Sequence, residues 1–204
     1  AARVENVRSR DEIGDLSKRI NVMAGELGER LELMKFVSHE TMTAIQAQGG
    51  EKISRGGERR AVTMLFSDIR GYTAFSETVS PEEVIEVLNR YFEVQSAIVE
   101  RHGGDIDKFV GDELMAMFTG EDKELRATRC AVEIARGLAE SMGAQKGQVL
   151  EVGIGIASGD AVLGAMGARG RMDYTVLGAT VNLAARLCSQ AEPGQVLLEA
   201  ATDR

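Results

Sequence analysis

The chain has 204 residues, of which 44% are hydrophobic, and its formal net charge is -8. This composition supports a globular domain with a full core, while the negative charge argues against a general nucleic-acid-binding protein, which needs a basic surface. The two cysteines, Cys130 and Cys188, and the two histidines, His39 and His102, have no metal-ligand spacing. A zinc enzyme or a histidine-based catalytic triad is therefore not expected. No apolar run approaches the roughly 18 residues of a membrane span.

Residues 1–34 predict a helix with one apolar stripe, because apolar residues follow one another at spacings of three and four. Two interpretations stay open: a parallel coiled-coil dimer, and an amphipathic helix packed on its own domain. The heavily charged opposite face favours the dimer. Residues 35–58 follow as a linker, with a short helix over 35–48 and a glycine-rich stretch after it. The residues of the stripe are Ile13, Leu16, Ile20, Met23, Leu27, Leu31 and Met34.

Residues 59–204 predict one α+β domain. Its first helix has an N-cap at Ser80, proline at the first helical position and Glu83 to complete a capping box. The order βαββα, followed by more strands, predicts a mostly antiparallel sheet covered by helices, whose core is a ferredoxin-like palm (βαββαβ). The expected elements are a strand over 61–67, a helix from 81 to about 102, strands over 106–110 and 114–118, a helix over 123–142, strands over 149–157, 161–166 and 172–177, a helix over 180–189 and a strand over 195–199.

Two aspartates stand at the ends of expected strands. Asp68 follows the first apolar strand, and Asp112 lies in the tight turn between the next two. Taken singly, each could be an ordinary turn or capping residue. If the strands are neighbours in the sheet, however, both carboxylates lie at one edge, and paired carboxylates without histidine suit hard cations such as Mg²⁺.

Three ordered motifs resemble those of the class III nucleotide cyclases, the family of adenylate and guanylate cyclases. The first runs from Phe66 to Thr73, the second from Gly103 to Glu113, and the third from Tyr174 to Arg186. The resemblance extends from about Gly56 to the end of the chain. It implies the class III cyclase fold and conversion of ATP to cyclic AMP and pyrophosphate.

The resemblance also implies a role for each matching residue. Asp68 and Asp112, with the backbone carbonyl of Ile69, would bind two divalent cations, Mg²⁺ or Mn²⁺. Asn182 would orient the ribose, and Arg186 would neutralise charge at the reacting phosphate. In this family the active site forms between two subunits, so the resemblance implies a homodimer with composite sites. The residues that it assigns to substrate binding are Ile69, Gly71, Tyr72, Thr73, Lys108 and Thr175.

Base specificity would depend on Lys108 and Thr175. Lys108 can donate to N1 of adenine but would face the N1–H donor of guanine, and Thr175 can accept from the adenine amino group. A guanylate cyclase would be expected to place an acidic residue at the position of Lys108. Guanylate cyclase remains one alternative, and a catalytically silent dimer that only relays signals remains another. A diguanylate cyclase is disfavoured, because in that family the acidic pair directly follows the glycines that correspond to Gly103 and Gly104.

The segment from Arg10 to Leu16, with Asn21 and Met23, resembles the second helix of a HAMP signalling module. Such a module usually follows a transmembrane helix, so the resemblance implies an upstream sensor region and a cytoplasmic domain tethered to the inner face of the plasma membrane. The sequence does not begin with Met, and related cyclase domains continue past the last expected strand. We therefore expect it to be a piece of a longer protein, ending before a lysine that binds the substrate phosphates in relatives.

Overall fold

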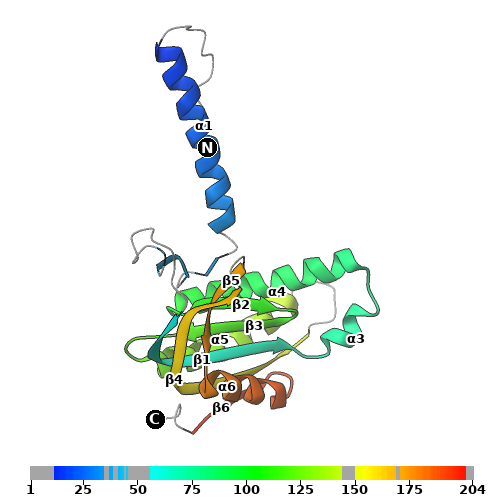
Figure 1. Cartoon of the computed structure of the whole chain (residues 1–204). Helices are drawn as coiled ribbons and strands as arrows, with labels where there is room; N and C mark the ends of the chain where they lie inside the picture. Colours follow the sequence, from blue (N-terminus) through cyan, green and yellow to red (C-terminus); the bar gives the residue numbers. More distant parts are fainter. Residues whose placement is uncertain are drawn as a thin grey trace.

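The computed structural model describes residues 12–34, 37–38, 41–43, 45, 56–143, 150–168 and 171–200. A helix, α1 (Glu12–Met34), projects from a domain built on a six-stranded sheet (Figure 1). Most of the expected short helix over 35–48 and most of the linker lie outside the described residues. The first strand begins at Gly56, earlier than the domain boundary expected at residue 59.

The sheet confirms the α+β class and the mostly antiparallel pairing. Its strands run in the order β2-β3-β1-β4-β5 with antiparallel pairing, and β6 pairs with β4 in parallel. The first four strands along the chain, in the order β2-β3-β1-β4, have the arrangement of the expected ferredoxin-like palm. The strands are β1 (Gly56–Ile69), β2 (Asp105–Val110), β3 (Glu113–Phe118), β4 (Val152–Ala168), β5 (Arg171–Leu177) and β6 (Val196–Leu198).

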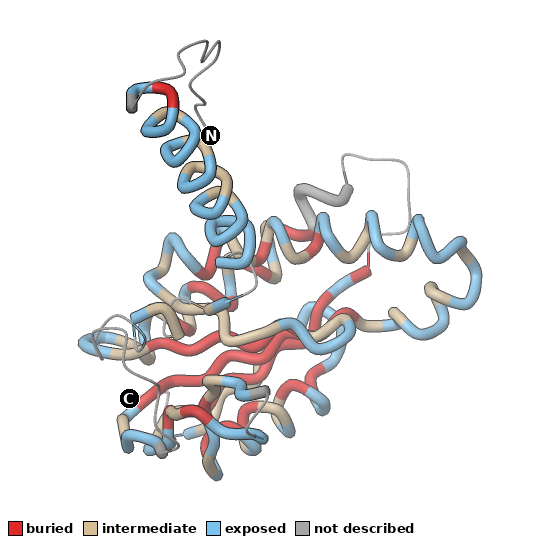
Figure 2. Tube along the Cα trace, turned by 45° about the horizontal axis from the view of Figure 1, so that its top comes forward, coloured by how far each residue is buried: buried red, intermediate tan, exposed pale blue. Residues whose placement is uncertain are grey.

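Helices cover both faces of the sheet. On one face, α4 (Pro81–Arg101) and α5 (Lys123–Gly143) share a core with the strands, and on the other α6 (Ala179–Gln190) does so. A short helix, α3 (Tyr72–Ser76), follows β1 directly. Because both faces are covered, the central strands are buried along most of their length (Figure 2).

Strand β3 shows how the sequence builds these two cores. Side chains alternate between the faces of a strand, and every residue from Leu114 to Phe118 is apolar and buried. The even-numbered residues join the core under α4 and α5, while Met115 and Met117 join the core under α6. A continuous apolar run therefore indicates a strand buried on both faces.

Helix α4 begins as the sequence predicts. The Ser80 hydroxyl accepts from the backbone amide of Glu83, and the Glu83 carboxylate accepts from the backbone amide of Ser80, with Pro81 at the first helical position. Two of the amides that lack a partner at the helix start are thereby satisfied, and Pro81 has no N–H that needs one. This cap fixes where the chain turns from the segment after Asp68 back across the sheet.

The prediction of separate strands over 149–157 and 161–166 is wrong, because β4 is one strand across that interval. Ser158, Gly159 and Asp160 fall between the two expected strands, but they pair with Thr63, Val62 and Ala61 of β1. Gly159 is needed there for space, since a Cβ at this position would lie 2.6 Å from Oγ1 of Thr180 in α6. The glycine therefore permits close helix–sheet packing rather than a turn.

The apolar stripe of α1 is exposed in the single chain. Its residues keep 41% to 68% of their surface accessible, from Met34 to Ile13, and Figure 2 shows α1 mostly in the colours of exposed and intermediate residues. The helix itself is thus present as predicted, and its apolar stripe is available to pack against a second molecule or another segment. Among the residues that the structure describes, no helix has the length and apolar character to cross a membrane.

Candidate active site

The two aspartates predicted to form a metal site do come together. Strand β1 pairs with β3 so that Asp68 lies opposite Glu113, and Asp112 immediately precedes Glu113 in the turn from β2. The turn is tight because Gly111 has φ 63°, a left-handed conformation that glycine adopts without strain. Strand pairing thus places residues from two distant motifs at one sheet edge.

The electrostatics of Asp112 reflect this proximity. Burial raises its pKa, and the charge of Asp68 raises it further, to about 6, whereas the backbone amide of Ile69 acts in the opposite direction. The pKa of Glu113 is also raised, by burial and then by Asp68 and Asp112. Carboxylates crowded in this way favour a proton or a cation between them.

Arg70 is a neighbour of this site that sequence analysis missed. Its Nη1 lies 2.5 Å from Oδ2 of Asp68, and its Nη2 donates to the backbone carbonyl of Cys188 near the end of α6. A side chain at Gly153 would occupy the space of this guanidinium, since a Cβ there would lie 2.3 Å from Nε of Arg70. Arg70 therefore links the metal-site aspartate to α6. The sequence feature that could have identified Arg70 is its position two residues after Asp68.

The donor set fits a divalent cation bound together with substrate. Asp68 and Asp112 supply two carboxylates, and Ile69 supplies a backbone carbonyl between them in sequence. Within the described ranges no group of three or more His, Cys, Asp or Glu residues could hold a metal ion by itself. Mg²⁺ usually binds through one or two carboxylates and substrate phosphates rather than in an all-protein cage, so two carboxylates suffice.

The segment after Ile69 turns sharply into α3. Gly71 has φ 76°, where a side chain would strain the backbone, and its carbonyl accepts from the amide of Phe75. Gly71 and Thr73 are exposed, but the ring of Tyr72 is half-buried and packs against the core under α4 and α5. The assignment of Gly71, Tyr72 and Thr73 to substrate binding stays a prediction, and the Tyr72 ring has a packing role of its own.

Lys108 and Thr175 meet at a residue that sequence analysis missed, Asp107. Lys108 Nζ lies 3.3 Å from Oδ2 of Asp107, and Thr175 Oγ1 donates to the same oxygen at 2.9 Å. Burial raises the pKa of Asp107, while the charge of Lys108 and the Thr175 hydroxyl act to lower it. The position of Asp107, directly before Lys108, was the only signal in the sequence.

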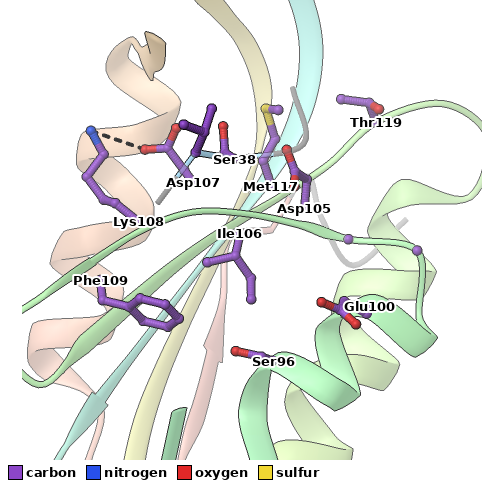
Figure 3. A pocket seen from close by; sticks show the side chains of 13 residues that line it. Ser38, Ser96, Glu100, Asp105, Ile106, Asp107, Lys108, Phe109, Met117 and Thr119 are labelled. Atoms are coloured by element: carbon purple, nitrogen blue, oxygen red, sulfur yellow. Dashed lines mark ion pairs between the residues drawn. The ribbon is translucent and has the colours of Figure 1, made fainter. Parts of the chain in front are cut away.

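Asp107 and Lys108 line a cavity of about 870 Å³ beside β2 (Figure 3), and Thr175 lies outside its lining. Asp105, Asp107 and Lys108 point to one side of the strand, whereas Ile106 and Phe109 point to the other. Phe109 stacks there on Phe92 of α4, with ring centroids 4.3 Å apart. The lining of this cavity includes neither the aspartates of the metal site nor the polar residues of α6.

Asn182 and Arg186 lie four residues apart on α6 and thus on one face of that helix. Both are exposed. Among the described residues, neither side chain has a hydrogen-bond or ion-pair partner. The single chain therefore brings together Asp68 with Asp112, and Lys108 with Thr175, but it leaves the Asn182–Arg186 face open.

Residues 56–204 match the protein family described as the adenylate and guanylate cyclase catalytic domain. The chain belongs to this family. An adenylate cyclase of Anabaena cylindrica is 35% identical over 192 residues, which cover 87% of this chain and 38% of the relative. The crystal structure of the guanylyl cyclase Cya2 matches with 41% identity and a TM-score of 0.67, covering 72% of this chain and 78% of that one. The adenylyl cyclase CyaB from P. aeruginosa matches with 36% identity and a TM-score of 0.67, covering 72% and 80%.

Membership in the cyclase family does not decide the nucleotide. The chain is similar to a guanylyl cyclase at 41% identity and to an adenylyl cyclase at 36%, so overall similarity favours neither base. The chain also spans only 34% to 38% of the length of the curated relatives it matches, such as an uncharacterized protein of Mycobacterium tuberculosis. The choice of base therefore has to be argued from the residues of the site.

Proposed function

We propose that this cyclase domain is an adenylate cyclase, which converts ATP to 3′,5′-cyclic AMP and pyrophosphate. The observation that carries the proposal is the meeting of Lys108 and Thr175 at one oxygen of Asp107. Lys108 presents N–H donors and suits adenine N1, an acceptor, whereas guanine offers a donor at that position. An acidic residue, as expected of a guanine-specific site, is absent from position 108.

The reaction needs no covalent enzyme intermediate. The ribose 3′-hydroxyl gives up its proton to water as its oxygen attacks the α-phosphorus. The bond from that phosphorus to the oxygen of the β-phosphate breaks, and pyrophosphate leaves with that electron pair. Because nucleophile and electrophile belong to one molecule, positioning supplies much of the acceleration. Asn182 orients the ribose, and the planar donors of Arg186 stabilise negative charge that develops at phosphorus.

Asp68, Asp112 and the carbonyl of Ile69 hold two divalent cations, Mg²⁺ or Mn²⁺, in this proposal. When bound, such ions lower the pKa of the attacking hydroxyl and offset charge on the leaving group. The raised pKa of Asp112 supports this role, since bound positive charge would offset the repulsion between the two carboxylates. Arg70 keeps Asp68 oriented through its ion pair.

We further propose that the active form is a homodimer with composite sites. The metal-binding aspartates come from one subunit, and the residues that contact the base, ribose and reacting phosphate come from the other. The open face of Asn182 and Arg186 supports this arrangement. So does the exposed apolar stripe of α1, which pairs with its copy as a parallel coiled coil and buries surface that is accessible in the single chain.

Helix α1 then links the catalytic domains to an upstream HAMP module and sensor in a longer, membrane-tethered protein. A change in the coiled coil would alter how the two catalytic domains face each other. Because the residues of each site come from both subunits, such a change would act directly on catalysis. This part of the proposal rests on the resemblance of the Arg10–Leu16 segment and on the exposure of α1.

Initial rates with ATP and GTP, in Mg²⁺ and in Mn²⁺, test the proposed function on the full-length protein that contains this chain. We expect formation of cyclic AMP and pyrophosphate, with kcat/KM for ATP exceeding that for GTP. A preference for GTP would replace the proposal with guanylate cyclase activity. Absence of turnover with both nucleotides, in a protein that is dimeric and folded, would favour the silent signal relay.

A further inference from the structure

Asp107 occupies an irregular position in β2. The register between β2 and β3 shifts between Ile106 and Lys108, so that Asp107 is the extra residue of a β-bulge. In a regular strand the side chains of Asp107 and Lys108 would point to opposite faces. The bulge instead directs both to the same side of the strand, where they form an ion pair (Figure 3). Bulges often redirect a side chain beside an active site.

Asp107 also joins two strands that are far apart in the sheet order. β2 and β5 lie at opposite ends of the path β2-β3-β1-β4-β5, yet Thr175 of β5 donates to Asp107. A cavity of about 10 Å³, the size of one water molecule, is lined by residues of β2, β3, β4 and β5 next to this bond. The side chain of Asp107 is only 9% exposed, so solvent does not compete freely for its oxygens.

The direction of the Thr175 hydrogen bond has a chemical consequence. A hydroxyl carries one hydrogen, and an ionised carboxylate only accepts hydrogen bonds. Because Thr175 donates its hydrogen to Asp107, the lone pairs of Oγ1 are what it offers to a base. These lone pairs can accept from the exocyclic amino group of adenine but would meet the O6 acceptor of guanine. Lys108, bound to the same carboxylate, can only donate.

We infer that Asp107 is a positioning residue that fixes the base preference of this cyclase: it holds Thr175 as an acceptor and Lys108 as a donor, the pattern complementary to the adenine edge. The inference deepens the proposed function and rests on contact of Lys108 and Thr175 with the base. Asp107 itself need not touch the nucleotide. It acts by leaving the hydrogen-bonding groups of guanine without partners. Unpaired polar groups discriminate between two bases more strongly than a small difference in shape does.

The test is Asp107→Asn, which keeps the size of the side chain. The amide of asparagine can donate to Oγ1 of Thr175, and the hydroxyl hydrogen is then free to point at guanine O6. We expect the ratio of kcat/KM for ATP to that for GTP to fall about 10- to 100-fold, the effect of losing a hydrogen bond to a charged group. If the Asp107–Thr175 hydrogen bond only stabilised the packing of β2 and β5, its loss would lower kcat/KM for ATP and GTP equally and leave this ratio unchanged.

A double-mutant cycle with Thr175→Val separates action through Thr175 from an independent effect. If Asp107 acts through Thr175, the change of ratio in the double variant is smaller than the product of the two single changes. The inference would be overturned if the change of ratio in the double variant equalled the product of the two single changes. A ratio for Asp107→Asn within twofold of the native one would also overturn it. Asp105→Asn, which alters a neighbouring acid that lines the same cavity, is the matched control and should leave the ratio unchanged.

Thermal unfolding of each variant checks the fold. If Asp107→Asn does not fold, Asp107→Glu takes its place, since it displaces the carboxylate by one methylene and should also lower the ratio. Failure of the proposed function would appear in the native chain, as a lack of turnover or a preference for GTP. The role of Asp107 is still decided in that case, because calorimetric affinities for ATP and GTP measure the base preference of each variant in binding, without turnover.

Discussion

The residues assigned to the base have side-chain partners within the single chain, whereas those assigned to the ribose and the reacting phosphate do not. Lys108 and Thr175 are held together by Asp107, which is nearly buried. Arg186 and Asn182 stand exposed on α6, and among the described residues their side chains have no partner. In the proposed dimer, base preference would be built into each chain, whereas the arrangement that accelerates the reaction would need a second subunit. A signal passing through α1 would then change the rate of the proposed reaction and not its substrate.

The largest expected effect comes from the metal site. Asp68→Ala should lower kcat by roughly 10³-fold or more, because metal ions supply several kcal/mol of transition-state stabilisation. Thermal unfolding should show the domain intact. The matched control is Asp160→Ala on β4. This exposed aspartate lies outside the three motifs, and its Oδ2 is 3.0 Å from Nη2 of Arg59. A retained rate in Asp68→Ala would contradict the metal-binding role.

Arg186→Ala separates rate from base preference. Loss of one donor to a developing charge typically costs about 10²- to 10³-fold in kcat, and we expect that loss with both ATP and GTP, so that the ratio between them stays at its native value. Asp107→Asn should show the reverse behaviour, with a changed ratio. Arg136→Ala, an exposed arginine of α5, is the control. If Arg186→Ala altered the ratio instead, the division between the two regions would be wrong.

The smallest effect concerns Asp112 in the metal-free protein. Its pKa in the folded state, about 6, lies above the ordinary value of 3.8, so the folded protein binds this proton more tightly than the unfolded chain does. The contribution to stability is therefore greatest at low pH and is lost as pH rises through about 6. Asp112→Asn should raise the free energy of unfolding at pH 8 by about 1 kcal/mol, after allowance for solvent screening. Denaturant titrations should find no gain below about pH 4.

The same carboxylate predicts an acid limit for metal binding. A carboxylate must lose its proton before it binds a cation, so the Mn²⁺ affinity of the native protein should fall as pH drops below about 6. Calorimetry at several pH values measures this dependence. A Mn²⁺ affinity unchanged between pH 7 and pH 5 would contradict the assignment of Asp112 as a ligand.

Local patterns predicted much of this molecule. The capping box at Ser80, the buried strand before Asp68 and the turn at Asp112 depend on neighbouring residues, and sequence analysis found all three. It missed Asp107 and Arg70, whose partners, Thr175 and the carbonyl of Cys188, lie far along the chain. Such contacts depend on sheet twist and helix packing, which no local pattern encodes.

The same limit explains the error in β4. Gly159 with its polar neighbours has the local composition of a turn. Its actual role, to admit Thr180 of α6 against the sheet, can be recognised only once the helix is in place. A turn-like composition inside a long strand therefore led to the prediction of two strands in place of one.

In the proposed dimer, each site combines the metal-binding residues of one subunit with the α6 residues of the other. Co-expression of Asp68→Ala and Arg186→Ala chains with different affinity tags tests it most directly. In a random mixture half of the dimers are mixed, and each mixed dimer has one intact site, so about a quarter of the native activity should return, with the native ATP-to-GTP ratio. Activity no higher than that of either variant alone, in dimers shown to be mixed, would contradict the shared site.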